Sequence, residues 1–224
     1  MSKRINELKK IVDKTKTYTL NEAVKLAKAT SNTKFDSNIE IHIKLGINTK
    51  KSDQQVRTSL NYPKNFGKTR VIAAFVANDR EKEAKEAGAD IVGGEELIKK
   101  IIQTKKINFD IAVATPDMMK LLAPAARILG PRGLMPSPKN NTVTPQIKEA
   151  IAEFKKGKIE FKNDAGGNIH LVIGKASFSE TDLIDNFNAA IDAIKKAKPS
   201  AAKGSYLKNI SISSCMGPGI KTQL

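Results

Sequence analysis

The segment Val71–Gln103 reads VIAAFVANDREKEAKEAGADIVGGEELIKKIIQ and alternates short apolar runs with charged stretches. Its first run, Val71–Val76, is typical of a strand buried on both faces, whereas Asp79–Gly88 has a helical composition and ends on a glycine. A second short strand in ADIVGG and a second helix, Glu95–Gln103, repeat this order. Strand–helix alternation with apolar strands predicts a parallel sheet covered by helices.

The same alternation continues towards the C-terminus. FDIAVATP contains a third strand, and Asp117–Leu129 is helical, although Pro124 is expected to kink or split that helix. The loop LGPRGLMPSPK follows at Leu129–Lys139, and a further helix is predicted between an early proline and Gly157. The middle of the chain is therefore predicted to be an α/β domain.

The two ends of the chain have a different pattern of apolar and polar residues. NIEIHIKLGI, at Asn38–Ile47, alternates apolar and polar residues, and KNISISSC alternates again near the C-terminus. KIEFK, NDAGGN and IHLVIG are predicted to form a hairpin that turns near Gly166–Gly167. Two helical segments, Leu20–Ala29 and Glu180–Lys196, accompany these strands. These features predict an antiparallel sheet with one wet face.

We therefore expect two domains, one α+β and one α/β. Residues 1–67 and 158–224 form the discontinuous α+β domain, and residues 68–157 form the inserted α/β domain with a mainly parallel sheet. The two crossings, near Gly67–Lys68 and Gly157–Lys158, carry glycine and lysine, as solvated connections often do.

The charge of the chain indicates a polyanionic partner. There are 39 Lys+Arg against 23 Asp+Glu, a net charge of +16 at pH 7. Such an excess of cations favours nucleic acid as the partner, because cationic side chains displace the counterions condensed on phosphates. Residues 68–157 hold 16 basic and 11 acidic residues, which leaves +11 of the net charge in the two ends. We expect the discontinuous domain to be the main anion binder.

The sequence lacks the motifs of several other function classes. No apolar run approaches the roughly 18–20 residues that span a bilayer, and the start of the chain lacks a secretory signal, so we expect a cytoplasmic protein without membrane contact. His42 and His170 lie on polar faces of predicted strands, without metal-ligand spacing, and are interpreted as solvated. Cys215 is the only cysteine, which precludes an internal disulfide and a cysteine zinc cage. We expect no catalytic residue, metal site or cofactor.

A phosphate-ligand enzyme is the alternative that we weigh against a binding protein. Parallel sheets often bind nucleotides at their carboxyl edge, and GADIVGGEE places two glycines between a strand and a helix. However, GxGxxG and GxxxxGK[ST] are both missing, and Glu95 and Glu96 put two negative charges where a phosphate would lie. A short turn before an acidic helix start explains the stretch better.

Three short elements of the end domain suit contacts with nucleic acid. In TKFDSN, Lys34 stands beside Phe35, whose ring can stack on a base, although a core position for Phe35 is an equally good interpretation. GKASF, which contains Lys175, is the second element. SSCMGPG, from Ser213, combines hydroxyl donors with a glycine that permits close backbone approach, although an ordinary strand and turn also explain it.

These elements are part of a resemblance that covers essentially the whole chain. It rests on seven blocks in order: KFDSNIEIHIKLGINTKKSDQQVR, EAGADIVGGEELI, VATPDMM, LGPRGLMPSPK, GKIEFKND, GKASF and SSCMGPG. They resemble the bacterial type of the ribosomal protein L-one family, which belongs to the mobile side stalk of the large subunit. The resemblance implies a discontinuous domain with an inserted Rossmann-like domain, and no enzymatic activity.

The resemblance also implies partners and a site. It implies a structural constituent of the large ribosomal subunit that binds large-subunit rRNA, assists release of deacylated tRNA from the exit site, and represses translation of its own operon by binding mRNA. The implied RNA-binding residues all lie in the discontinuous domain and are Lys34, Phe35, Asn38, Lys175, Ser213, Cys215, Met216 and Gly217.

The chain departs from the family at two positions of this site. Cys215 stands where the family usually has threonine, and a thiol is a weaker hydrogen-bond donor than a hydroxyl. Asn38 stands where threonine is common, and its amide can still form a hydrogen bond. LGPRGLMPSPK is interpreted as a rigid docking loop, with Arg132 and Lys139 as secondary RNA contacts, because it carries no catalytic group and precedes the last helix of its domain.

Overall fold

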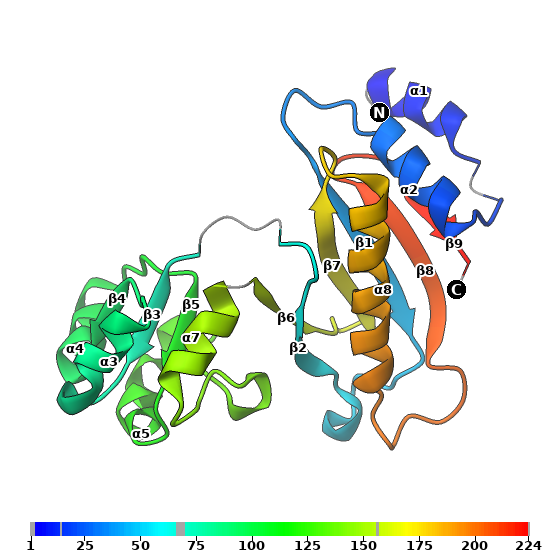
Figure 1. Cartoon of the computed structure of the whole chain (residues 1–224). Coiled ribbons are helices and arrows are strands. Elements are labelled where there is room, and N and C mark those ends of the chain that lie inside the picture. Colours follow the sequence, from blue (N-terminus) through cyan, green and yellow to red (C-terminus); the bar gives the residue numbers. More distant parts are fainter. Residues whose placement is uncertain (1–2, 14, 66–69, 156, 224) are drawn as a thin grey trace. The chain divides into compact units, whose positions relative to one another are not determined.

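The structure is a computed structural model that describes residues 3–13, 15–65, 70–155 and 157–223 (Figure 1). Internal contacts divide the chain into two compact units. The end unit comprises Met1–Phe66 and Ile159–Leu224, and the inserted unit comprises Gly67–Lys158. The end unit contains an antiparallel sheet and the inserted unit a parallel one, so the mixed α/β and α+β fold class is confirmed.

A four-stranded antiparallel sheet forms the centre of the end unit. Its strand order is β7 (Asn168–Lys175), β1 (Asn38–Leu45), β8 (Leu207–Ser214) and β9 (Ile220–Thr222). Alternate residues of β1 are buried, which confirms the alternation read from the sequence. Ile41, for example, lies opposite Leu171 on β7 and Ile212 on β8, so apolar side chains form rows on one face of the sheet.

Two helices cover the apolar face of this sheet (Figure 1). They are α2 (Leu20–Ala29) and α8 (Glu180–Lys196), and both begin and end at the predicted residues. Each has a side-chain N-cap: the Thr19 and Glu22 side chains cap α2 reciprocally, and the Ser179 hydroxyl accepts a hydrogen bond from the backbone N–H of Asp182 in α8. A shorter helix, α1 (Lys3–Ile11), precedes them.

The predicted hairpin between the sixth and seventh strands is wrong. The chain does turn there, since the backbone N–H of Asn168 donates to the Asp164 carboxylate at 2.7 Å. However, β6 (Lys158–Lys162) pairs with β2 (Arg57–Asn61) in a separate two-stranded sheet, and β7 pairs with β1. A turn signal determines that the chain reverses, but it leaves open which strand each arm pairs with.

Two hydrogen bonds direct β6 towards β2. The backbone N–H of Val56 donates to the side-chain oxygen of Asn163 at 2.7 Å, and the backbone N–H of Asn163 donates to the carbonyl of Val56 at 3.0 Å. Val56 precedes β2 and Asn163 follows β6, so this pair joins the ends of the two strands. β7 is left to pair with β1, whose alternation it matches.

A three-stranded parallel sheet forms the centre of the inserted unit. Its order is β4 (Ile91–Gly93), β3 (Ile72–Phe75) and β5 (Ile111–Ala114). One face packs against α4, α5 and α6, and the other against α3 and α7. These helices span Glu95–Thr104, Met118–Leu122, Ala126–Leu129, Glu81–Glu86 and Ile147–Lys155, respectively. The parallel sheet covered by helices is therefore confirmed.

Short 3-10 turns complete the structure, and one of them confirms the split at Pro124. They span Ser52–Gln54, Asn78–Arg80, Ala123–Ala125 and Pro138–Asn140. The third lies between α5 and α6, because Pro124 lacks the N–H that a continuous helix requires. In the loop after α6, Leu134 and Met135 pack against the core formed by α4, α5 and α6, while Arg132 is exposed. Within the residues described, no helix is long and apolar enough to cross a membrane.

Candidate nucleic-acid interface

Strand register brings three loops together at one end of the four-stranded sheet. Asn38, at the start of β1, lies opposite Lys175 at the end of β7, and Ile39 lies opposite Ser214 at the end of β8. The backbone N–H of Ala176 donates to the carbonyl of Ser37, and that of Cys215 donates to the carbonyl of Asn38, each at 2.8 Å. The eight predicted RNA-binding residues therefore come from neighbouring segments. We call them the loop surface: Lys34, Phe35, Asn38, Lys175, Ser213, Cys215, Met216 and Gly217.

Two large apolar side chains of the loop surface are open to solvent. Phe35 is 55% exposed and Met216 is 65% exposed. The interpretation of Phe35 as a core residue is therefore wrong. Burying a side chain of this size contributes about 1.5–3 kcal/mol relative to leaving it exposed, so the free protein does not gain this stabilisation at either residue. Single exposed apolar residues are common on protein surfaces, but two on neighbouring loops are consistent with a surface that contacts a partner.

Arg4 joins the two loops that carry these side chains. Its guanidinium nitrogens donate to the carbonyl of Asn32 at 3.0 Å and to that of Met216 at 3.2 Å. Sequence reasoning missed Arg4, because Arg4 and Met216 are 212 positions apart and no local pattern connects them. The effect is to hold the segment before Phe35 and the turn at Met216 in one arrangement.

The backbone of the turn at Met216 adopts a conformation that is unfavourable for residues other than glycine. Met216 has φ of 64°, in the left-handed region that costs a non-glycine residue about 1–3 kcal/mol. A Cβ atom on Gly217 would lie 2.2 Å from Oγ of Ser214 and 3.2 Å from its carbonyl oxygen. Ser214 is buried, and its hydroxyl lies 3.4 Å from that of Thr30. Glycine at 217 therefore allows the turn to pack closely on β8.

The cations of the loop surface have different surroundings. Lys34 is exposed. The ammonium of Lys175 lies 3.8 Å from the Asp36 carboxylate, which also accepts hydrogen bonds from the backbone N–H and the hydroxyl of Ser177 at 3.1 and 2.9 Å. Because an exposed pair of this kind contributes little to stability, Lys175 can exchange Asp36 for a phosphate at small cost. Asp36 is a second residue of this region that sequence reasoning missed.

Ser213 is turned towards the histidines rather than towards open solvent. It is 8% exposed, and its Oγ lies 3.0 Å from Nε2 of His42. His42 also contacts His170 across the sheet. His170 is exposed, as the sequence predicted, whereas the interpretation of His42 as simply solvated is wrong because its side chain is half-buried and contacts Ser213. Burial, and to a smaller extent the charge of His170, lowers the pKa of His42, while Glu40 partly opposes this. Cys215 is half-buried.

The two predicted secondary contacts belong to the inserted unit. Arg132 is exposed in the loop after α6. The backbone of Lys139 lies in the turn Pro138–Asn140, but its side chain is outside the part of the chain that the structure describes.

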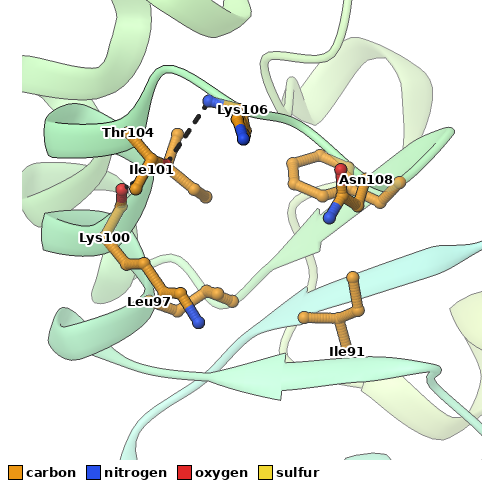
Figure 2. Close-up of a pocket in the computed structure, with 8 residues that line it drawn as sticks. Ile91, Leu97, Lys100, Ile101, Thr104, Lys106 and Asn108 are labelled. Atoms are coloured by element: carbon orange, nitrogen blue, oxygen red, sulfur yellow. Dashed lines mark hydrogen bonds between the residues drawn. The ribbon is translucent and has the colours of Figure 1, made fainter.

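Among the cavities of the inserted unit, two are lined in part by α4. Figure 2 shows the first, of about 360 Å³, where Leu97 and Ile101 of α4 face Ile91 across the opening. Lysines, Thr104, Asn108 and Phe109 complete its lining, which contains no acid, histidine or cysteine. The second, of about 810 Å³, lies at the start of α4, and its charged lining residues are Glu81, Glu95, Glu96, Lys99 and Lys100. The three carboxylates outnumber the two ammonium groups, one of which pairs with Glu95 at 2.9 Å, and this balance disfavours a phosphate ligand.

Comparison with known proteins assigns the family. The ribosomal protein L1p/L10e family matches residues 27–218. The chain is 51% identical to the large ribosomal subunit protein uL1 of Mesoplasma florum, over 100% of this chain and 98% of the relative. It is 47% identical to the proteins of the same name from Thermosipho melanesiensis, over 98% and 95%, and Fervidobacterium nodosum, over 100% and 95%.

These matches exclude the phosphate-ligand enzyme. The family consists of structural ribosomal proteins and not of enzymes. The absence of enzymatic activity and the family resemblance of the sequence motifs are both confirmed. A match that spans residues 27–218, together with relatives that are about half identical over nearly their whole length, leads to one conclusion. The chain belongs to the ribosomal protein L1p/L10e family.

Proposed function

We propose that this protein is a structural constituent of the large ribosomal subunit and binds large-subunit rRNA at the mobile side stalk through the loop surface. Membership of a ribosomal protein family makes it cytoplasmic and ribosome-associated. The names of the relatives, which are proteins of the large ribosomal subunit, support the proposed location.

The observation that carries the proposal is the exposure of Phe35 and Met216 on two loops that Arg4 holds together. An exposed aromatic ring beside a cation suits a nucleotide, whose base can stack on the ring while its phosphate meets the ammonium. The net charge of the end unit also favours RNA binding. Residues 67–158 hold 17 basic and 11 acidic residues, so +10 of the net +16 lies in the end unit.

Each part of the loop surface has a distinct proposed role. Lys34 and Lys175 meet phosphates, and Phe35 stacks on a base or wedges beside it. Gly217 allows the RNA backbone to approach, while neighbouring polar groups contact ribose 2′-hydroxyls. Because the thiol of Cys215 is a weak donor, we propose that this position contributes through shape and not through a strong hydrogen bond.

The electrostatic part of the proposal is tested by the variant Lys34→Gln in filter-binding titrations with a stalk rRNA fragment. We expect the variant to bind more weakly at low salt, and the slope of log affinity against log salt to decrease by about 0.7–0.9, because one phosphate contact is lost. Lys99→Gln is the matched control, since Lys99 is an exposed cation of α4 that pairs with Glu95 at 2.9 Å. An identical slope for wild type and Lys34→Gln would remove Lys34 from the interface.

Two further roles follow from the same surface. We propose that the protein assists release of deacylated tRNA from the exit site, and that it represses translation of its own operon by binding an mRNA structure similar to the stalk rRNA. A single surface holds one RNA at a time, so the leader of the operon mRNA is expected to compete with the rRNA fragment in the same titration. Simultaneous binding of both RNAs would contradict the shared surface. Arg132 and Lys139 are proposed secondary contacts to the stalk.

A further inference from the structure

Two histidines meet on the face of the four-stranded sheet that α2 and α8 leave open. β1 and β7 pair with His42 directly opposite His170. Nδ1 of one ring lies 2.8 Å from Nδ1 of the other, and the ring centroids are 5.0 Å apart. His170 is exposed and His42 half-buried, so the contact is reached from solvent. Their 128-residue separation explains why no spacing motif revealed the pair.

The other nitrogen of each ring faces oxygen atoms. Nε2 of His42 lies 3.0 Å from Oγ of Ser213 and 3.9 Å from the Glu40 carboxylate. Nε2 of His170 lies 3.6 Å from the Asp164 carboxylate. Because the two Nδ1 atoms are 2.8 Å apart, one of them donates a hydrogen bond to the other in the free protein. A metal ion between them replaces that proton, and Ser213 and Asp164 then face the Nε2 protons of the two rings. Histidine ligands of metal ions in proteins usually have this kind of support at their second nitrogen.

We propose that His42 and His170 form a binding site for a divalent transition-metal ion of the zinc or nickel type, held between their two Nδ1 atoms. Imidazole nitrogen is a preferred ligand of these metals. With Zn–N bonds of about 2.0–2.1 Å and a tetrahedral angle, the two nitrogens stand about 3.3 Å apart. The rings therefore separate by about 0.5 Å from their present 2.8 Å, a movement that the exposed His170 ring permits.

The charges around the pair favour a cation. Glu40 on β1 and Asp164 on the turn before β7 bring two carboxylates to the rings. Ser211 and Ser213 face them from β8 as neutral groups, and Lys221 of β9 lies beyond Ser211 in the register. The ammonium of Lys44, the neighbouring cation of β1, donates to the carbonyl of Gly166.

The number of protein ligands defines the kind of site. Among the residues that the structure describes, no group of three or more His, Cys, Asp or Glu side chains is placed to hold a metal ion. The proposed site has two protein ligands, with water completing the coordination, whereas structural zinc sites have four. The metal is therefore exchangeable, and its effect is to link β1 to β7 reversibly. This inference does not depend on RNA binding.

The test is a titration of the full-length chain with ZnCl₂, followed by long-range ¹H–¹⁵N NMR of the imidazoles. Because the chain has only two histidines, every imidazole signal belongs to the pair. We expect both Nδ1 signals to shift together and to saturate at one equivalent of Zn²⁺. A shift of one ring alone, or no saturable change below about 1 mM Zn²⁺, would mean that only a proton bridges the rings, and would overturn the proposal.

Substitutions of the two histidines test whether the ion binds between them. His42→Gln and His170→Gln are each expected to weaken Zn²⁺ binding by about tenfold or more, since loss of even an outer partner of a ligand costs about 10–100-fold. Cys215→Ser is the matched control and is expected to bind Zn²⁺ as the wild type does. Loss of zinc binding in Cys215→Ser, or its retention in both histidine variants, would assign the ion elsewhere. Far-UV circular dichroism checks the fold, and the wild-type spectra decide the question if a variant unfolds.

Discussion

Replacing Phe35 with alanine is expected to lower the affinity for a stalk rRNA fragment between about fivefold and about 150-fold, without a change in stability. The range follows from the roughly 1–3 kcal/mol that stacking of one base on an aromatic side chain contributes. Stability is expected to be unaffected because Phe35 is 55% exposed in the free protein, so its truncation creates no cavity in the core. The measurements are a filter-binding titration at fixed salt and a thermal unfolding curve.

Leu121→Ala is the matched control for this experiment. Leu121 is 43% exposed, but it lies on α5 of the inserted unit and is not part of the loop surface. The Leu121→Ala variant loses an apolar side chain of similar size, and it is expected to bind the rRNA fragment with wild-type affinity. Equal affinities of Phe35→Ala and the wild type would exclude Phe35 from the interface. Equal losses in Phe35→Ala and Leu121→Ala would show that general surface hydrophobicity, and not the loop surface, supports binding.

A methyl group at Gly217 is expected to weaken RNA binding to a similar degree. In Gly217→Ala, the new Cβ lies 2.2 Å from Oγ of Ser214 unless one of them moves. Such overpacking costs about 1–3 kcal/mol, because either the buried Ser214 hydroxyl must leave its contact with Thr30 or the turn that presents Met216 must shift. We expect a loss of affinity of about fivefold to 150-fold in the filter-binding titration.

A second substitution separates this steric effect from other causes. Ser214→Ala removes the atom that clashes, and the next contact of the new Cβ is then the Ser214 carbonyl oxygen at 3.2 Å. The double variant Ser214→Ala, Gly217→Ala is therefore expected to recover most of the lost affinity. Ser214→Ala alone serves as the control. If the double variant binds as weakly as Gly217→Ala, the glycine acts directly on the RNA and not through its packing on Ser214.

Local patterns predicted the individual elements of the fold well. The alternation in Asn38–Ile47 specified which face of β1 is buried, and no competing period was present. The helical patterns located both helices of the end unit at their observed ends, and in the structure Thr19 and Ser179 cap their starts. Pro124 split its helix for a reason that acts within the chain itself, the missing N–H.

Pairing between distant segments was the part that the sequence did not determine. The turn at Asp164–Asn168 was recognised, but the partner of β6 depends on Asn163 reaching Val56, which is 107 positions away. The contact between His42 and His170 requires the register of β1 against β7, and the bridging role of Arg4 requires both loops to be in place. These contacts arise from tertiary structure, for which local periodicity gives no signal.

In the candidate site, too, the sequence predicted the residue types but not their exposure or contacts. The residue types of Lys34, Phe35 and Gly217 suit a phosphate, a base and a close backbone approach, but each also has an ordinary structural explanation, so only the resemblance to the family selected them as RNA contacts. The sequence left the position of Phe35 open between core and surface, and its exposure in the structure resolves this. Ser213 is less open than its motif indicated, since β8 turns its hydroxyl towards His42.

The proposed function depends above all on the loops at one end of the four-stranded sheet, which are assigned as the RNA-binding surface. The decisive experiment is hydrogen exchange of the full-length chain, with and without a stalk rRNA fragment. We predict that RNA slows exchange in residues 30–37, 176–179 and 215–219, while exchange in α4, Glu95–Thr104, stays unchanged. Slower exchange confined to residues 70–155, with none in the three loops, would refute this assignment.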